Sequence, residues 1–511
     1  MNLHARPAQP RAIRLHPEDD VAVAPDGLKA ADAVEGVEAR QRIPRGHKVA
    51  LRPLAEGAPV RKFGQIIGFA TQPIAPGEHV HSHNLAFREF ERDHAFGADA
   101  APERLVPEAE RRTFEGFRRA NGRAGTRNYV GVLTSVNCSA SVAKFIAREI
   151  ERSGVLEDYP NVDGVCAFVH ATGCGMAADG EAFEQFERVQ WGYATHANLG
   201  ACLMVGLGCE VFQIPRMKQK YGIAEGDNFR SFTIQEQGGT RKAVEAGVAA
   251  LREMLPAANA CRRETLPAAG LSLALQCGGS DGYSGVTANP ALGVAADLLV
   301  AQGGTAILAE TPEIYGAEHL LTRRADSRET GEALLAIIDW WRDYTAKNGM
   351  VMDANPSPGN KAGGLTTILE KSLGAAAKGG STTLRGVYRY AEAVERRGFA
   401  FMDTPGYDPA SVTGQVAGGA NLVAFTTGRG SAFGFKPTPS LKLATNSDTF
   451  ARMEEDMDVN CGEVLEGVSL EEKGREIFET LLRVASGERT KSERLGYGDE
   501  EFTPWQIGAV M

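Results

Sequence analysis

The stretch Leu271–Pro290, LSLALQCGGSDGYSGVTANP, decides the fold class. Its first part is an apolar run that ends in Gly-Gly, which predicts a buried strand over 271–279. The polar, glycine-rich remainder predicts a turn that leads into a helix over 290–302. A strand, a turn and a helix in this order form one step of the alternation that builds a parallel sheet.

The alternation continues downstream of this stretch. Residues 305–310 (TAILAE), 421–428 (NLVAFTTG) and 440–445 (SLKLAT) are apolar runs that predict further buried strands. Residues 328–347 are expected to form a long helix. Residues 270–511 are therefore expected to form an α/β unit with a mainly parallel sheet.

Another α/β unit is expected upstream, over 113–260. Its strands are predicted from three apolar runs, NYVGVLTSV (128–136), VDGVCAFVH (162–170) and ANLGACLMVGLG (197–208). Helices are expected over 139–152 and 243–254. The first of these is amphipathic, with one face formed by Val142, Phe145, Ile146 and Ile150.

The N-terminal part of the chain has a different pattern. Residues 12–95 contain short apolar runs separated by Pro- and Gly-containing turns, which predicts a small all-β module. Residues 96–112 are rich in Ala, Pro and charge and are expected to be a linker. A second break, at 255–269, is expected to separate the two α/β units. The fold prediction is thus a small all-β module followed by two α/β units.

Composition restricts the classes of function. The 511 residues include 55 Lys and Arg against 65 Asp and Glu, and this net charge of −10 argues against a nucleic-acid partner. No apolar run reaches the ~18 residues of a membrane-spanning helix, and the N-terminus lacks the apolar segment of a secretion signal. Eight Cys are too sparse for a disulfide scaffold. We therefore expect a cytoplasmic protein without a membrane partner.

Histidines cluster in the all-β module. The run EHVHSHN places His79, His81 and His83 at alternate positions, so on a strand their side chains would share one face. His47 lies in the same module. Imidazole is a ligand of iron, zinc, nickel and copper, which makes these four residues candidates for metal or substrate binding. The alternative is a polar edge strand or loop in which histidines cluster by chance.

Four cysteines, Cys138, Cys174, Cys209 and Cys277, each follow a predicted strand. Ligands bind open α/β sheets at the carboxyl ends of their strands. Thiols at this edge could bind a metal or an iron–sulfur cluster, or line a redox-sensitive pocket. Cysteine also packs well as a small apolar residue. No Cys-x-x-Cys spacing occurs, so a shared site would have to be assembled from distant segments.

Glycine-rich polar segments supply candidate substrate contacts. Glycine lets backbone N–H groups approach an anion closely, and arginine suits a carboxylate. The candidates are Gly278, Gly279, Ser280, Asp281, Asn289, Asn360 and Arg429, with Lys361 as an additional charged group. The same residue types also form ordinary turns.

Nucleotide and serine-hydrolase chemistry find less support in these segments. Neither a P-loop nor a GxGxxG helix start occurs, which argues against a nucleotide enzyme. GGSDG (278–282) matches GxSxG, but the polar loop that follows Ser280 does not fit a nucleophile elbow.

Together these motifs resemble the altronate/galactarate dehydratase family of sugar-acid hydro-lyases, over about residues 13–487. The resemblance rests on GHKVAL (46–51), GEHVHSHN (77–84), GxxGTRN (122–128), GLGCE (206–210), QCGGSDGYSGVTANP (276–290), NPSPGNKAGG (355–364), FTTGRG (425–430) and LATNS (443–447). It implies that the N-terminal module is an SAF-type β-clip domain. It also implies a dependence on Fe²⁺ or Mn²⁺ and the loss of water from a hexonate or hexarate.

The resemblance also suggests the substrate, a small sugar acid. The HVHSHN run is similar to the altronate branch, so altronate is the expected substrate. Galactarate is the alternative, because FEGF, TSVNC and YPNVDGV (159–165) look closer to that branch. A related hydroxy acid such as sulfolactate is a third candidate.

The expected chemistry is removal of the proton α to a carboxylate, which a divalent metal assists as a Lewis acid. Lys361 is the expected base, and the four strand-end cysteines are candidate catalytic groups. A binding-only regulator and a hydrolase remain as other classes of function. A homodimer is the working expectation for the oligomeric state.

Overall fold

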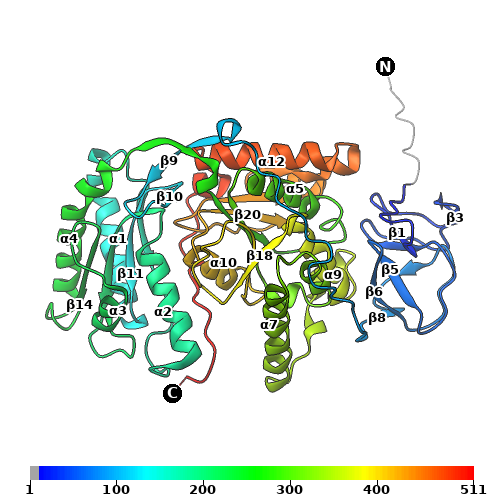
Figure 1. The fold of residues 1–511 in the computed structure, drawn as a ribbon, viewed down its shortest axis with the longest axis horizontal. Helices are drawn as coiled ribbons and strands as arrows, with labels where there is room; N and C mark the ends of the chain where they lie inside the picture. The colour runs from blue at the N-terminus through cyan, green and yellow to red at the C-terminus, as the bar shows by residue number, and fades with distance from the viewer. Residues whose placement is uncertain (1–10, 511) are drawn as a thin grey trace.

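The computed structural model describes residues 11–510 and contains an all-β module followed by two α/β units, as predicted (Figure 1). The strands of the module pair antiparallel in two three-stranded sheets, β1-β4-β7 and β5-β6-β8, and a hairpin, β2-β3. Their bounds are β1 (Val21–Val23), β2 (Ala33–Val34), β3 (Val37–Glu38), β4 (Lys48–Ala50), β5 (Pro59–Lys62), β6 (Gln65–Ala70), β7 (His79–Val80) and β8 (Leu85–Ala86).

The segment between the module and the first α/β unit is not detached from the rest of the molecule. Backbone N–H groups of Gly97, Asp99 and Val106 donate to carbonyl groups of the C-terminal unit. The short helix η1 (Glu108–Glu110) follows. The predicted linker 96–112 therefore contains a turn and a short 3-10 helix, and it is hydrogen-bonded along the surface of the second α/β unit.

The first α/β unit is a four-stranded parallel sheet with strand order β12-β11-β13-β14. Its strands are β11 (Tyr129–Thr134), β12 (Gly164–Phe168), β13 (Leu199–Gly206) and β14 (Phe229–Thr233). Helices cover both faces: α1 (Ala140–Arg152) and α4 (Thr240–Ala260) pack on one, and α2 (Gly180–Ala194) and α3 (Ile214–Tyr221) on the other. The turns η2 (Asn137–Ser139) and η3 (Val155–Asp158) flank α1.

Helix α1 differs from its predicted amphipathic face at one position. Val142, Ile146 and Ile150 are buried against α4 and the sheet, whereas 47% of Phe145 is exposed. The helical period placed Phe145 near the edge of the apolar stripe, where the neighbouring α4 does not cover it.

A small antiparallel sheet joins segments that the sequence pattern did not connect. Its order is β10-β9-β15, formed by β9 (Thr113–Arg118), β10 (Ala124–Gly125) and β15 (Arg263–Pro267). The predicted break at 255–269 therefore contains the end of α4 and a strand. Because β15 pairs with β9, the strand that precedes the first α/β unit lies beside the strand that follows it.

The second α/β unit is built on a seven-stranded parallel sheet with strand order β18-β19-β17-β16-β20-β21-β22. The strands are β16 (Ser272–Cys277), β17 (Thr305–Leu308), β18 (Leu384–Tyr388), β19 (Gly398–Met402), β20 (Leu422–Thr427), β21 (Ser440–Ala444) and β22 (Val459–Asn460). Because β17 and β20 flank β16 on opposite sides, the chain changes direction across the sheet at β16, the kind of position where α/β sheets bind ligands.

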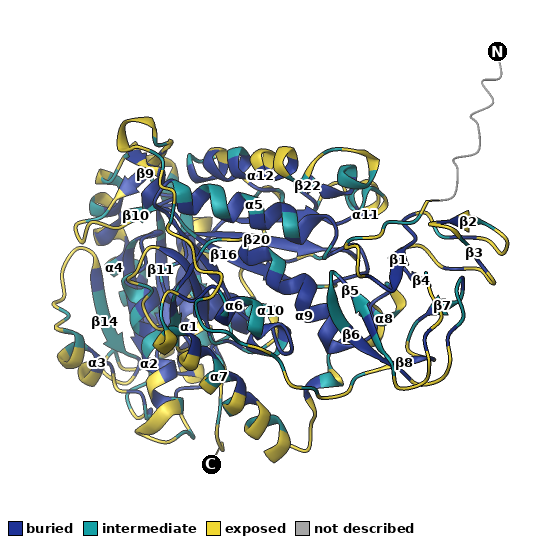
Figure 2. Ribbon diagram, turned by 45° about the vertical axis from the view of Figure 1, so that its right-hand side comes forward, coloured by how far each residue is buried: buried dark blue, intermediate teal, exposed yellow. Residues whose placement is uncertain are grey.

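Helices cover this sheet on both faces. They are α5 (Ala288–Ala301), α6 (Glu318–Thr322), α7 (Arg328–Lys347), α8 (Pro358–Ala362), α9 (Ile368–Ala376), α10 (Asp408–Ala417), α11 (Ser447–Arg452), α12 (Leu470–Ala485) and α13 (Lys491–Leu495). Short 3-10 turns are η4 (Ala268–Gly270), η5 (Thr311–Glu313), η6 (Met352–Ala354), η7 (Ala377–Gly379) and η8 (Cys461–Glu466). Every residue of α9 is buried, because this helix lies between the second unit and the β module (Figure 2). Among the described residues, no helix has the length and apolar character needed to cross a bilayer.

Candidate active site

Three potential metal ligands meet at the carboxyl end of β16. Cys277 is the last residue of that strand, and Glu310 and Glu313 follow the neighbouring strand β17. All three are at most 4% exposed, and one ligand atom from each lies within 4.8 Å of the others. The parallel sheet thus brings together three residues that are distant in sequence, and they could hold a metal ion. We call them the triad.

Two buried lysines contact the triad. Lys378, in η7, places Nζ 2.7 Å from Sγ of Cys277 and 3.8 Å from Oε2 of Glu310. Lys371, on α9, donates to Oε1 of Glu313 over 2.5 Å and to Oδ1 of Asn355 over 2.9 Å. A buried charge is costly unless it is paired, so the lysines and the acids stabilise one another.

The acids near the triad differ in their proton affinity. Burial raises the pKa of Glu310 well above its usual range, and the charge of Glu313 raises it further. Burial acts in the same direction on Glu313, but Lys371 and Lys378 outweigh it and lower its pKa. Burial raises the pKa of Asp408, at the start of α10, to about 6, although Gln276 donates to it over 2.9 Å.

The thiol and the ammonium beside it are also perturbed. Burial raises the pKa of Cys277 to about 12. Burial alone would lower the pKa of Lys378, but the groups around it, Cys277, Glu310 and Glu313, outweigh that effect and raise it. At neutral pH the site therefore combines a fixed ammonium with a carboxyl, Asp408, that titrates near the operating range.

The triad has an unsatisfied acceptor that a cation would complete. Oε2 of Glu310 is buried and accepts no hydrogen bond from the described residues. Buried polar atoms are rarely left without a partner, and such an atom calls for an explanation such as an ion. One sulfur and two carboxylates form a donor set that suits a first-row transition metal.

The β module is anchored beside this site through a buried charge cluster. Lys48 and Lys62 donate to the two carboxylate oxygens of Glu370 over 2.9 and 3.0 Å, and all three side chains are at most 2% exposed. The two lysines hold the pKa of Glu370 well below its usual range, against the effect of burial. Glu370 immediately precedes Lys371 on α9, so the residue that anchors the module adjoins one that contacts the triad.

The structure brings the four predicted histidines together. The rings of His47, His79, His81 and His83 form a chain of contacts with centroids 4.9–5.4 Å apart. Nδ1 of His47 lies 3.0 Å from Nε2 of His79, and Nε2 of His81 lies 2.9 Å from the carbonyl oxygen of Lys361. Burial lowers the pKa of His47 to about 4 and that of His79 to about 3, so both rings are neutral at pH 7.

The histidine cluster does not have the compact geometry of a preformed metal site. Among the described residues, no three of its rings bring one nitrogen each to within 4.8 Å of the others. The cluster lies where the module meets α8, and its predicted role as a metal or substrate site stays a prediction.

The predicted substrate-binding turn is engaged in hydrogen bonds within the protein. Asp281 is buried and accepts from Ser284, Thr445 and Asn446. The carbonyl oxygen of Gly279 accepts from the backbone of Gly428 and Arg429, and Gly278 N donates to Thr426. These bonds hold the loop after β16 against the loop after β20.

The two predicted asparagines hold the same loops. Asn289 donates to the carbonyl oxygen of Gly374 and accepts from Thr426 over 2.6 Å. Asn360 completes the capping box of α8, in which its Oδ1 accepts from Ser357 N, and it donates to the carbonyl oxygen of Ser280 over 2.8 Å. Both residues therefore position the loops around the triad.

Lys361 and Arg429 are less enclosed than the triad. Lys361 is half-buried on α8, and Arg429 is exposed. Within the described chain, neither side chain forms an ion pair or a hydrogen bond of its own. Their assignments as base and carboxylate ligand stay predictions.

The four strand-end cysteines do not lie together in one site. Cys277 belongs to the triad, whereas Cys138, Cys174 and Cys209 are exposed free thiols on the first α/β unit. Each of these three follows a strand of the four-stranded sheet, as the sequence predicted.

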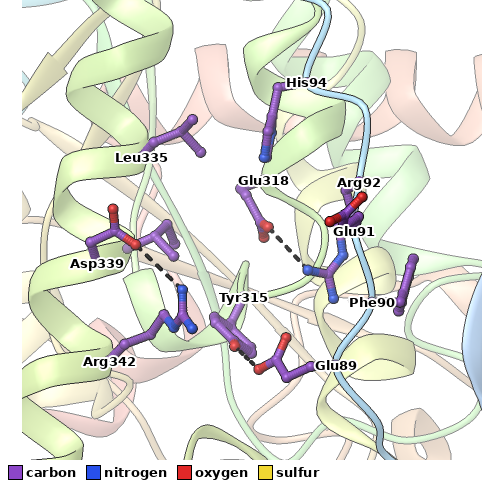
Figure 3. A pocket seen from close by; sticks show the side chains of 11 residues that line it. Glu89, Phe90, Glu91, Arg92, His94, Tyr315, Glu318, Leu335, Asp339 and Arg342 are labelled. Atoms are coloured by element: carbon purple, nitrogen blue, oxygen red, sulfur yellow. Dashed lines mark hydrogen bonds and ion pairs between the residues drawn. The ribbon is translucent and has the colours of Figure 1, made fainter.

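A surface pocket of about 700 Å³ lies apart from the triad, between residues 89–94, α6 and α7 (Figure 3). Arg92 and Glu318 form an ion pair across it at 3.5 Å, and Tyr315 donates to Glu89. It contains none of the residues predicted to carry the chemistry.

Sequence reasoning missed most of the groups around the triad, namely Glu310, Glu313, Lys371, Lys378 and Asp408. One signal was present, because Glu310 ends the predicted strand TAILAE in the same way that Cys277 ends β16. The lysines lie in the segment LEKSLGAAAKGG, where no local pattern marks them as buried.

Family models match three consecutive parts of the chain. They are the altronate/galactarate dehydratase SAF domain over residues 10–88, the D-galactarate dehydratase/altronate hydrolase second domain over 116–259, and the D-galactarate/altronate dehydratase C-terminal domain over 268–510.

Curated relatives cover almost the whole chain. An altronate dehydratase of Bacillus subtilis is 35% identical over 98% of this chain and 99% of its own length. A galactarate dehydratase (L-threo-forming) of Escherichia coli is 38% identical, with 97% of each chain covered. The β subunit of a (2R)-sulfolactate sulfo-lyase of Chromohalobacter salexigens is 33% identical over 78% of this chain and 98% of its own length. With three family models in order and relatives matched from end to end, this chain belongs to the altronate/galactarate dehydratase family.

Proposed function

We propose that this protein is a hydro-lyase that removes water from a sugar acid to give a 2-keto-3-deoxy acid, with altronate as the first candidate substrate. The observation that carries the proposal is the buried group of acids and ammoniums at the carboxyl end of β16. The near-complete match to altronate and galactarate dehydratases supports the same reaction class.

The reaction needs a base for the proton on the carbon next to the carboxylate. We assign this role to Asp408, because burial raises its pKa to about 6 and a base is most effective when its pKa lies near the operating pH. It accepts the C2 proton while the electrons move into the enediolate-like state. Asp408 thereby takes the role that the sequence suggested for Lys361.

The hydroxyl group on C3 must leave as water. Lys378 is suited to donate the proton from Nζ, because its raised pKa keeps it an ammonium at neutral pH. Lys371, paired with Glu313, places a second positive charge near the carboxylate as negative charge accumulates there. The enol that remains takes a proton from solvent at C3 and becomes the keto acid.

The triad fits the divalent metal that the family resemblance implies, because the buried Oε2 of Glu310 accepts no hydrogen bond from the described residues. Cys277, Glu310 and Glu313 would hold it, and a sulfur donor favours iron over harder cations. When bound, ferrous iron would supply Lewis-acid stabilisation of the substrate carboxylate.

Galactarate is the second candidate, supported by the 38% identical galactarate dehydratase. A hexarate carries a carboxylate at each end, whereas a hexonate carries one. Arg429 and Lys361 are the sequence-predicted cations available for a second carboxylate.

The test is turnover under anaerobic, reducing conditions with added ferrous iron. The panel holds altronate, galactarate, mannonate, glucarate and sulfolactate, and each product is identified by mass. Formation of a keto acid that has lost one water from altronate or galactarate supports the proposal. Release of sulfite from sulfolactate, without dehydration of any sugar acid, would contradict it.

A further inference from the structure

Three exposed cysteines lie at one edge of the first α/β unit, and none of them is among the residues assigned to the reaction. Cys138 lies in η2 after β11, Cys174 follows β12, and Cys209 follows β13. These strands are neighbours in the parallel sheet, with β11 between the other two. Their carboxyl ends therefore meet along one edge, where open α/β sheets bind ligands.

Backbone contacts bring the three loops together. Asn137 N donates to the carbonyl oxygen of Thr172 over 2.9 Å, which joins the loops of Cys138 and Cys174. Val211 N donates to the carbonyl oxygen of Gly173 over 3.0 Å, which joins the loops of Cys174 and Cys209. Each cysteine is at most two residues from such a contact, so the three cysteine-bearing loops lie side by side at this edge of the sheet.

The loops are shaped for this close approach. Gly173 has φ of 97°, and a Cβ placed on it would lie 2.1 Å from the carbonyl oxygen of Ser135, so no side chain fits there. Glu210 accepts from the hydroxyl of Ser135 over 2.6 Å and from the backbone of Gly208 over 2.5 Å. The residue after Cys209 thus fixes its loop to the end of β11.

The separation of the thiols favours a polynuclear group over a single ion. Three thiolates on one zinc or iron ion would lie within about 4.6 Å of each other, since each metal–sulfur bond is ~2.3 Å. Within residues 11–510, the three sulfurs do not all lie within 4.8 Å of one another, whereas the ligand atoms of the triad do. In a [4Fe–4S] cluster each thiolate binds a different iron, which suits a wider spacing.

We propose that Cys138, Cys174 and Cys209 hold an iron–sulfur cluster at the carboxyl edge of the four-stranded sheet. The three thiols are exposed, so the cluster would be reachable from solvent, and with three protein ligands it would keep a coordination position for water or a small ligand. This site is separate from the triad, and it does not depend on which sugar acid is the substrate.

The test is anaerobic reconstitution of the full chain with ferrous iron and sulfide, followed by desalting, absorption and EPR spectroscopy, and iron and sulfide analysis. The wild-type protein should retain acid-labile sulfide with iron and show a broad absorption band near 400 nm, and each of Cys138→Ser, Cys174→Ser and Cys209→Ser should lose most of both. Because these side chains are exposed, circular dichroism and thermal unfolding of the variants should match the wild-type protein.

Two control variants make the outcome specific. Cys261→Ser changes a partly exposed cysteine at the end of α4 and should retain the full cluster. Cys277→Ser removes the triad sulfur, and it should lose turnover while it keeps the cluster signal. A wild-type protein that retains no sulfide, a signal that survives in all three serine variants, or binding of one zinc ion in place of a cluster would overturn the proposal.

Discussion

The ammonium of Lys378 lies 2.7 Å from the sulfur of Cys277, with both side chains enclosed in the second α/β unit. The contact joins the loop after α9 to the carboxyl end of β16. Burial alone would lower the pKa of Lys378 and disfavour its charged form. The neighbouring Cys277, Glu310 and Glu313 outweigh this effect and raise the pKa, so a positive charge is kept beside the triad. The proposed proton donor is thus held by the same groups that are proposed to bind the metal.

Substitution of Lys378 by Met should reduce kcat for the best sugar acid by roughly 10²–10⁴-fold, the range for loss of a positioned proton donor. Lys473→Met is the matched control, because Lys473 is also buried but pairs with Glu463 and Glu476 at the surface. Steady-state kinetics on both variants, with unfolding curves to confirm folding, check the prediction. Equal losses of kcat in the two variants would contradict the role of Lys378.

The pH dependence of turnover should have an acid limb set by Asp408. Below its pKa of about 6 the carboxyl is protonated and cannot accept the C2 proton, so activity should rise as the pH passes through 6. Asp408→Asn should abolish this limb together with most of kcat.

Asp403→Asn provides the control for this profile. Burial also raises the pKa of Asp403 to about 6, but its carboxylate accepts from Trp341 and Thr311 outside the triad. The acid limb should persist in this variant. If the acid limb disappears in Asp403→Asn and survives in Asp408→Asn, the assignment of Asp408 as the base is wrong.

Docking of the β module should depend on Glu370. Glu370→Gln leaves Lys48 and Lys62 buried without a counter-charge, a change that typically costs about 3–5 kcal/mol. Denaturant unfolding measures the loss, and proteolysis within 87–112 should accelerate. Glu479→Gln, which breaks the exposed pair with Arg112, should cost less than about 1 kcal/mol. A loss for Glu370→Gln as small as that of the control would show that the cluster does not anchor the module.

Acid should destabilise the protein partly through His196, which joins the two α/β units. Its Nε2 donates to the carbonyl oxygen of Ala420 over 3.0 Å and its Nδ1 accepts from Asn198 N over 3.1 Å, so protonation would remove an acceptor. Burial lowers its pKa to about 4.

The sign of the effect follows from the two pKa values. Between pH 6.5, where the unfolded side chain titrates, and pH 4, the unfolded state binds the proton and the folded state does not, so stability falls as the pH falls. The contribution of His196 over this window is on the order of 3 kcal/mol. His196→Gln should flatten the slope of unfolding free energy against pH in this window. An unchanged slope would show that His196 does not contribute to the acid sensitivity of the fold.

The sequence predicted the parallel sheets well, because their strands are continuous apolar runs such as those of β13 and β20. It did not predict the antiparallel sheet that joins β9 to β15, since pairing between distant segments leaves no local period. The same limit applies to the site. Cys277 was found because it ends a strand, but Lys371 and Lys378 lie in and after a helix that is buried on all sides, where no polar face distinguishes them.

The histidines illustrate the opposite case. Their alternation in EHVHSHN predicted a shared face, and the rings do cluster. Among the described residues, however, it is the triad and not the histidine cluster whose ligand atoms are close enough together to hold one metal ion. A repeated residue type identifies which side chains gather. It does not fix the spacing of their nitrogens, which is set here by the packing of the module against α8.

The most direct test of the proposed reaction is proton NMR of altronate turnover in D₂O by the iron-loaded enzyme, read at early time points, with galactarate in a parallel sample. We expect a 2-keto-3-deoxy acid that carries one deuterium at C3, because the enol takes its proton from solvent. A keto acid without deuterium at C3 would contradict the proposed path by showing direct hydrogen transfer, and altronate and galactarate that both remain intact would contradict the proposed activity itself.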